Sequence, residues 1–139
     1  MEPFDLQMSL SMSGNPDVDR STIEIMLRAM VAVNRAWLRR NPAAPHLYDA
    51  GARYIREPQG GGYWMDYGEI LRRGGADCED LATALVAWYQ ETGQDPYASI
   101  QVLEYPDQTT DMIHWHVVVR RRDGTIEDPS RVLGMEGVA

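Results

Sequence analysis

The fold is decided by the stretch Gly74-Gly75-Ala76-Asp77-Cys78-Glu79-Asp80-Leu81, which runs from a glycine pair into a helix and carries the only cysteine of the chain. From Cys78 onward, apolar residues recur at helical spacing until Gly93, a common C-terminal cap. The apolar positions are Leu81, Ala82, Leu85, Val86 and Tyr89. The pattern predicts a largely buried helix with Cys78 in its first turn.

Helical patterns also precede this stretch. Ser21-Thr22-Ile23-Glu24 has the pattern of a capping box and predicts the start of a long helix. An apolar stripe at three- and four-residue steps follows, and Arg39-Arg40 and Pro42 mark the end of this helix. Pro45 predicts a second, shorter helix that stops near Gly51. The long helix is therefore expected to present one apolar face to the core.

Strand patterns dominate the second half of the chain. A short helical turn at 69–73 leads into the cysteine stretch, and strands are predicted at 98–104, 112–120 and 125–128. Asp123-Gly124 between the last two strands is a strong hairpin signal. Helices followed by antiparallel strands predict an α+β domain, with the cysteine helix packed on a small antiparallel sheet.

The totals describe a globular chain of ordinary size. With 139 residues, 44% of them hydrophobic and 24% charged, the chain is long enough for one core. A formal net charge of -8 argues against general binding of nucleic acid or anionic membranes. One cysteine cannot form an intrachain disulfide, and no long apolar run predicts a signal peptide or a membrane span.

The N-terminal residues show a different period. Leu6, Met8, Leu10 and Met12 alternate with polar residues, which predicts a half-buried strand that Gly14-Asn15-Pro16 ends. Residues 1–16 are therefore assigned to an N-terminal strand or arm, and residues 17–139 to the domain. An isolated strand must pair with the sheet of its own domain or with another chain, so residues 4–12 are a candidate site of homo-oligomerisation.

Cysteine, histidine and aspartate recur in an order that allows nucleophilic catalysis. Cys78 opens a helix, where free backbone N–H groups favour a thiolate. His114 and His116 lie two apart on one predicted strand, so either could reach the helix end. Asp128 lies on the next strand and could orient the histidine. These residues predict a Cys-His-Asp triad, in which the histidine removes the thiol proton.

Other interpretations of these residues exist. A lone cysteine is often a small core residue, and an aspartate before proline is often part of a turn. Asp77, Glu79 and Asp80 place negative charge beside the sulfur, which raises the pKa of a thiol. A zinc site formed by Cys78 and the two strand histidines is a further hypothesis.

Three sequence blocks resemble the transglutaminase-like superfamily of papain-fold cysteine enzymes. They are Gly75 to Leu81, His116 to Val119 and Glu127 to Ser130. The chain looks most similar to small single-domain members encoded by bacteriophages and prophages, which share its Tyr54 to Pro58 stretch, Trp64 and the Ser130 to Met135 stretch. The resemblance spans residues 48–135.

The resemblance implies roles for particular residues. Cys78 would be the nucleophile, His116 the base and Asp128 its orienting partner, with His114 as the reserve base. His116 is preferred because an apolar strand run follows it directly. The oxyanion would be bound by the backbone N–H of Cys78 and one upstream side chain, for which Trp64 and Tyr67 are the candidates.

The resemblance also implies a function and a setting. We expect a transglutaminase-like hydrolase or transamidase that acts on a protein or peptide amide through a thioester, without metal or cofactor. The setting would be bacteriophage-related, in the bacterial cytoplasm or in the virion, with phage structural proteins as possible partners. The alternative is a catalytically silent structural protein of a phage particle that retains the fold.

Overall fold

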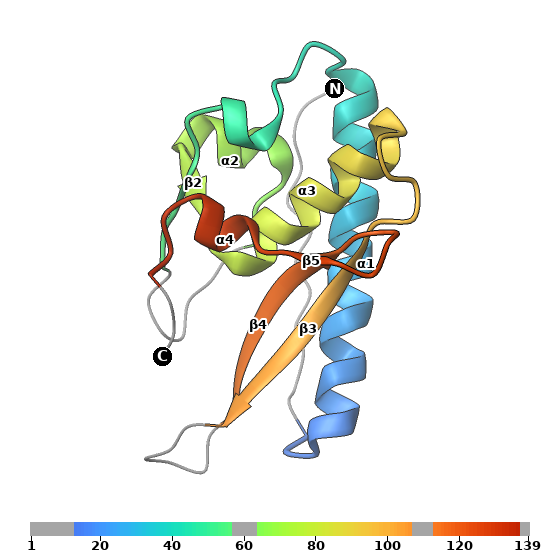
Figure 1. Ribbon diagram of the computed structural model, residues 1–139, viewed down its shortest axis with the longest axis vertical. Coiled ribbons are helices and arrows are strands. Elements are labelled where there is room, and N and C mark those ends of the chain that lie inside the picture. The colour runs from blue at the N-terminus through green and yellow to red at the C-terminus, as the bar shows by residue number, and fades with distance from the viewer. Residues whose placement is uncertain (1–12, 57–63, 107–112, 137–139) are drawn as a thin grey trace.

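The computed structural model describes residues 13–56, 64–106 and 113–136 and has the mixed α+β architecture that the sequence predicted (Figure 1). Its elements in chain order are α1 (Pro16–Arg40), the 3-10 helix η1 (Leu47–Asp49), β1 (Arg53–Tyr54), α2 (Tyr67–Arg73), β2 (Gly75–Ala76), α3 (Cys78–Thr92), β3 (Ser99–Pro106), β4 (Ile113–Arg120), β5 (Ile126–Glu127) and α4 (Pro129–Val132). The predicted N-terminal strand and oligomerisation segment lie outside the described residues.

The long helix α1 begins earlier than its sequence pattern predicted. Asn15 is the N-cap, and its side chain accepts hydrogen bonds from the backbone of Asp17 and Val18. Pro16 occupies the first turn, where its missing N–H costs nothing. Ser21 instead lies inside the helix, and its hydroxyl donates to the Asp17 carbonyl oxygen at 3.1 Å. The predicted capping box at Ser21 was therefore wrong, because an earlier polar residue takes the capping role.

The cysteine helix α3 is central in the molecule. It packs against α1 on one side and against β4 on another (Figure 1). Its apolar residues are buried along nearly its whole length, and they are Leu81, Ala82, Ala84, Leu85, Val86, Ala87 and Tyr89. Gly93 ends the helix in the left-handed conformation, with φ of 76°. The prediction of a buried helix that starts at Cys78 and ends at Gly93 is confirmed.

The main sheet of the described residues has the strand order β3-β4-β5 and is antiparallel. Long β3 and β4 pair along their whole length, with Leu103 opposite His116, whereas β5 pairs through two residues only. The turn between β4 and β5 contains Gly124 at φ of 86°, as the predicted Asp123-Gly124 hairpin requires. Val117 and Val119 on β4 contribute to the core beneath α3.

The structure also contains a two-stranded sheet that was not predicted from the sequence. Strand β1 pairs in parallel with β2, with Arg53 opposite Gly75 and Tyr54 opposite Ala76. Gly75 has no space for a side chain, because a Cβ there would collide with the Arg53 carbonyl oxygen and the Ile55 side chain. This pairing fixes the backbone immediately before Cys78.

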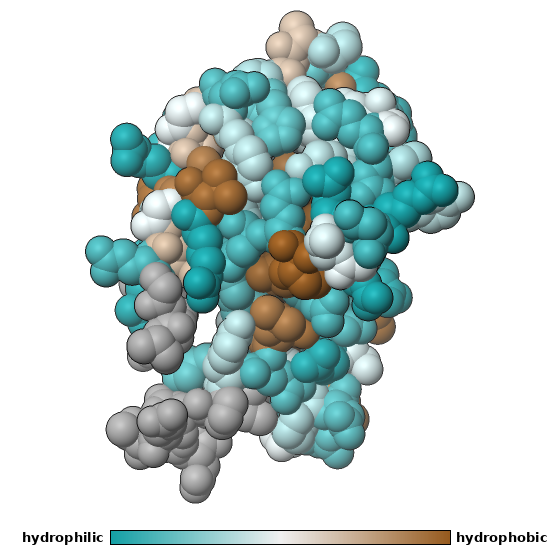
Figure 2. All heavy atoms as spheres, in the orientation of Figure 1, coloured by the Kyte–Doolittle hydropathy of each residue, from teal (hydrophilic) through white to brown (hydrophobic). Residues whose placement is uncertain are grey.

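Two further observations concern the hydropathy of the molecule. The face shown in Figure 2 is mainly hydrophilic, with its apolar residues in small separate groups. Among the residues that the structure describes, none of the helices is both long and apolar enough to span a membrane.

Candidate functional site

Cys78 is the first residue of α3, and the turn between α2 and α3 determines its position. Helix α2 ends at Gly74, whose φ of 79° is left-handed, and the β1-β2 pairing then directs the chain into α3. Asp77 is the N-cap, and its carboxylate accepts from the backbone N–H of Asp80 at 3.4 Å. The sulfur therefore lies at the amino end of a 15-residue helix, where the helix dipole favours negative charge.

His116 and Asp128 form a direct pair. The His116 Nε2 lies 2.7 Å from the Asp128 Oδ2, and the side chains are only 13% and 15% exposed. An ionised carboxylate only accepts hydrogen bonds, so in this pair Nε2 carries the proton and Nδ1 is left to exchange a proton elsewhere. The two residues that the sequence assigned as base and orienting partner are brought together.

Asp128 is itself held by helix α4. Its Oδ1 accepts from the backbone N–H groups of Ser130 and Arg131, at 3.1 and 3.4 Å. The Arg131 Nε lies 3.5 Å from Oδ2. One oxygen of the carboxylate therefore caps the helix and the other contacts the histidine, which fixes the plane of the carboxylate.

Cys78 lies beside the strand that carries His116. Burial is the main cause that raises the pKa of the Cys78 thiol, the nearby Glu79 and Asp77 carboxyls add to it, and the nearby Val117 backbone lowers it. Val117 follows His116 directly on β4, the strand against which α3 packs. The start of α3, β4 and the β5-α4 corner therefore converge on one site.

Two of the acidic residues around the sulfur, Glu79 and Asp80, have raised pKa values. The Glu79 Oε2 lies 3.6 Å from the Cys78 Sγ. Burial, reinforced by Asp77, raises the pKa of Glu79 to about 8 and that of Asp80 to about 9. Protonated carboxyl groups carry no charge, so these two residues oppose a thiolate at neutral pH less than their sequence positions suggested.

Asp80 connects α3 to the segment before α2. Its Oδ1 accepts from the backbone N–H of Met65 at 2.8 Å. Its buried Oδ2 has no hydrogen-bond partner among the described residues, and the nearby Asp77 carboxyl adds to burial in raising the pKa of Asp80. Both observations favour a protonated Asp80, because an unpaired carboxylate is more costly to bury than a neutral carboxyl group.

The two oxyanion candidates differ in their surroundings. Tyr67 is fully buried, its ring stacks on Trp37 and Trp88, and its hydroxyl donates to the Pro45 carbonyl oxygen at 2.7 Å. That hydroxyl is therefore already hydrogen-bonded within the core. Trp64 is partly buried and adjoins Met65, which is bonded to the first turn of α3. Trp64 is therefore the better placed of the two predicted side chains.

The reserve base and the hypothetical zinc site receive less support. His114 is exposed and lies opposite Tyr105, two residues before His116 on β4. Among the residues with described placement, no group of three or more His, Cys, Asp and Glu side chains is arranged to hold a metal ion. Cys78 and the two strand histidines thus do not form such a group.

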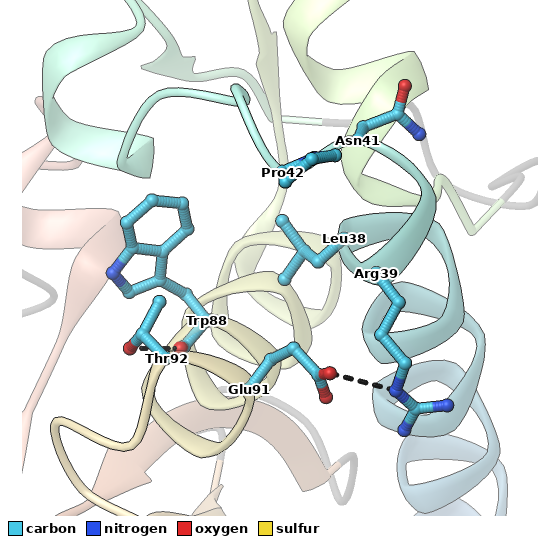
Figure 3. Close-up of a pocket in the computed structure, with 7 residues that line it drawn as sticks. All are labelled: Leu38, Arg39, Asn41, Pro42, Trp88, Glu91 and Thr92. Atoms are coloured by element: carbon cyan, nitrogen blue, oxygen red, sulfur yellow. Dashed lines mark hydrogen bonds and ion pairs between the residues drawn. The ribbon is translucent and has the colours of Figure 1, made fainter.

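A shallow pocket lies at the other end of α3 (Figure 3). It is lined by Leu38, Arg39, Asn41, Pro42, Trp88, Glu91 and Thr92. Trp88 lies ten positions after Cys78, or about 15 Å along a helix. The charged Arg39 and Glu91 that border the pocket are paired with each other at 2.8 Å. This pocket is therefore separate from the cysteine site.

A group of residues behind the histidine pair was not predicted from the sequence. Glu127 accepts hydrogen bonds from two tyrosine hydroxyls and from Arg121. Glu127 lay within the quoted Glu-Asp-Pro-Ser block, but its bonding partners Tyr48 and Tyr89 are 79 and 38 residues away in the sequence. Only the folded arrangement reveals this group.

Comparisons with protein-family models, curated proteins and solved structures found no significant match for this chain.

Proposed function

We propose that the chain is a cysteine acyl-transfer enzyme of the transglutaminase-like class, with a papain-like arrangement of its α+β fold. The observation that carries this proposal is the 2.7 Å pair of His116 and Asp128. His116 directly precedes Val117, the β4 residue whose backbone acts on the Cys78 sulfur. A nucleophile at a helix start, a base and an orienting carboxylate are the parts that acyl transfer needs.

The chemistry follows from these positions. The His116 Nδ1 accepts the Cys78 thiol proton, and the sulfur attacks the carbonyl carbon of an amide. The resulting oxyanion is stabilised by the backbone N–H of Cys78 at the positive end of α3, with Trp64 as the second candidate donor. The tetrahedral intermediate collapses, the C–N bond breaks, and His116 returns the proton to the departing amine. A thioester between Cys78 and the acyl group remains.

A second nucleophile then resolves the thioester. His116 removes a proton from water, the resulting hydroxide attacks the thioester carbonyl, and the C–S bond breaks to give a carboxylic acid and the free thiol. A substrate amine in place of water gives a new amide. The proposed substrate is an amide of a protein or peptide. From its resemblance to phage-encoded proteins, the proposed location is the host cytoplasm or the virion.

Thiol labelling tests the proposal. We expect iodoacetamide to label Cys78 at pH 6.5 to 7 in the native protein, and His116→Ala to slow labelling by roughly 10²-fold, the usual contribution of a general base. His114→Ala is the matched control, because it removes a histidine from the same strand and should change the rate little. Equal rates in wild type and His116→Ala would contradict the proposal.

One observation favours a second candidate function, a structural protein that retains the fold. Burial and acidic neighbours together raise the pKa of the Cys78 thiol, and a neutral, partly buried thiol packed against the core is an ordinary structural residue. Under this alternative, Cys78 is labelled only after denaturant is added, and no histidine variant changes the native rate. The labelling experiment therefore separates the two functions directly.

A further inference from the structure

Glu127 is the centre of a hydrogen-bond network behind the proposed catalytic pair. Its carboxylate accepts from the Tyr48 hydroxyl at 2.6 Å, the Tyr89 hydroxyl at 2.8 Å and the Arg121 Nη1 at 3.0 Å. The Glu127 side chain is 20% exposed, so water screens these contacts only in part. Hydrogen bonds to an ionised carboxylate are among the stronger ones in proteins. The position of Glu127 is therefore determined by three donors at once.

The three donors come from separate parts of the fold. Tyr48 lies in η1, Tyr89 in α3, and Arg121 directly after β4. The Arg121 guanidinium also stacks on Tyr89, 4.0 Å from the ring centroid, and its Nε donates to Asp95 at 2.9 Å. Burial and the bond to Glu127 raise the pKa of Tyr89 to about 12, so its hydroxyl remains a donor at neutral pH.

Strand β5 has few other contacts that fix its position. It pairs with β4 through only two residues, Val119 opposite Glu127 and Arg120 opposite Ile126. Ile126 is 50% exposed and contributes little buried apolar surface. A two-residue strand with one exposed side chain is weakly held by its ladder alone. The Glu127 network is therefore the main attachment of β5 on the side before Asp128, and the buried start of α4 is the attachment on the other side.

The residue after Glu127 is Asp128, which contacts His116 at 2.7 Å. We propose that Glu127 is a positioning residue that acts through the β5 backbone to hold Asp128 against His116. This role rests on the proposed acyl-transfer function, because it is through the histidine that the network would affect catalysis. A displacement of β5 by a fraction of an ångström would lengthen the hydrogen bond between Asp128 and His116. The imidazole would then no longer be held in a single orientation.

Proton NMR of the His116 imidazole tests this role without any substrate. In the wild-type protein we expect a downfield, slowly exchanging resonance from the Nε2–H that bonds Asp128, and its absence from Asp128→Ala identifies it. Glu127→Gln removes the charge that attracts three donors. We expect exchange of the Nε2–H to become faster by about tenfold or more, the factor expected for the loss of one hydrogen bond to a charged group.

Glu91→Gln is the matched control. Glu91 is also a carboxylate that accepts from two cationic side chains, Arg35 and Arg39, but it lies near the far end of α3 from Cys78. The control should keep the wild-type resonance. The double variant Tyr48→Phe and Tyr89→Phe, which keeps both rings, should accelerate exchange as Glu127→Gln does. An unchanged exchange rate in Glu127→Gln overturns the proposal, and so does equal acceleration in Glu91→Gln.

This experiment distinguishes the inference from the function on which it rests. The Nε2–H resonance reports the position of Asp128 even in a protein that transfers no acyl group. An inert Cys78 together with a Glu127-dependent resonance would remove the acyl-transfer function and retain the positioning role. A reactive Cys78 together with a resonance that is unchanged in Glu127→Gln would retain the acyl-transfer function and remove the positioning role.

Discussion

Asp80 is the most deeply buried of the three acidic residues around Cys78, with 1% of its surface exposed. It occupies the position in the first turn of α3 where an acidic residue normally bonds back to the N-cap backbone. Here it accepts from Met65 instead, which ties another segment to the cysteine helix. The residue thus joins two parts of the candidate site.

Replacing Asp80 by asparagine should make stability less dependent on pH. Burial raises the pKa of Asp80 from an ordinary 3.8 to about 9 in the folded protein, so the folded state holds a proton that the unfolded state releases. Its contribution to stability is complete below about pH 4 and is lost as the pH rises through about 9. Asp80→Asn removes this loss, so urea unfolding at pH 8 should show a more stable protein than wild type.

Two further variants check this explanation. Asp80→Ala should be less stable than wild type by about 1 to 3 kcal/mol, because the buried N–H of Met65 loses its acceptor. Asp17→Asn, at an exposed site in α1, is the control for the substitution itself. If Asp80→Asn were as unstable as Asp80→Ala at every pH, Asp80 would act as a carboxylate and the protonated state would be wrong.

The corner formed by β5 and α4 combines a structural and a proposed catalytic role in one side chain. Asp128 caps α4 through Oδ1 and contacts His116 through Oδ2. Its neighbours Pro129 and Ser130 are buried and open the helix. Substitutions of Asp128 can therefore separate the two roles.

Asp128→Asn should uncouple stability from reactivity. Asparagine retains an oxygen that can cap α4, so the melting temperature should change little. Its amide nitrogen donates toward Nε2, which places the imidazole proton on Nδ1 and prevents that atom from accepting the thiol proton. Labelling of Cys78 at pH 7 should fall by about tenfold or more. Unchanged labelling, alongside an unchanged melt, would show that Asp128 serves only as a helix cap.

Elements governed by local signals were predictable, and those governed by distant contacts were not. The helix from Cys78 to Gly93 and the turn at Asp123-Gly124 follow from spacing and glycine conformation. The start of α1 was misplaced because Asn15 and Ser21 are both good N-cap residues, and the sequence does not rank them. The parallel β1-β2 pair joins strands 22 residues apart, a contact that no periodicity reveals.

The same division applies to the candidate site. Cys78, His116 and Asp128 were identified from their order and their elements, and the structure joins the last two. Two other features depend on tertiary contacts between distant segments. They are the hydrogen bond from the Tyr67 hydroxyl to Pro45 and the hydrogen bonds around Glu127. Residue type alone indicates neither, because any tyrosine or glutamate could have been exposed.

At the scale of the whole molecule, the N-terminal residues are proposed to mediate association. Residues 4–12 alternate in hydropathy, but they lie outside the described part of the chain. Removing residues 1–12 is the appropriate truncation, because Ser13 and Gly14 bond the Asp19 carboxylate at the start of α1 and should be kept. We predict that the full chain elutes from gel filtration as a larger species than the truncated chain. Identical elution would leave the arm no role in assembly.

The molecule as a whole places a helix start, a strand and a capped corner around one sulfur, and in the proposed reaction this sulfur carries an acyl group. Intact mass spectrometry after mixing with p-nitrophenyl acetate measures this directly. We predict that native wild-type protein gains one acetyl group on Cys78 and then loses it, whereas Cys78→Ala gains none and His116→Ala gains it far more slowly. Absence of acetylation in the native protein, or equal acetylation in His116→Ala, would rule out acyl transfer through Cys78.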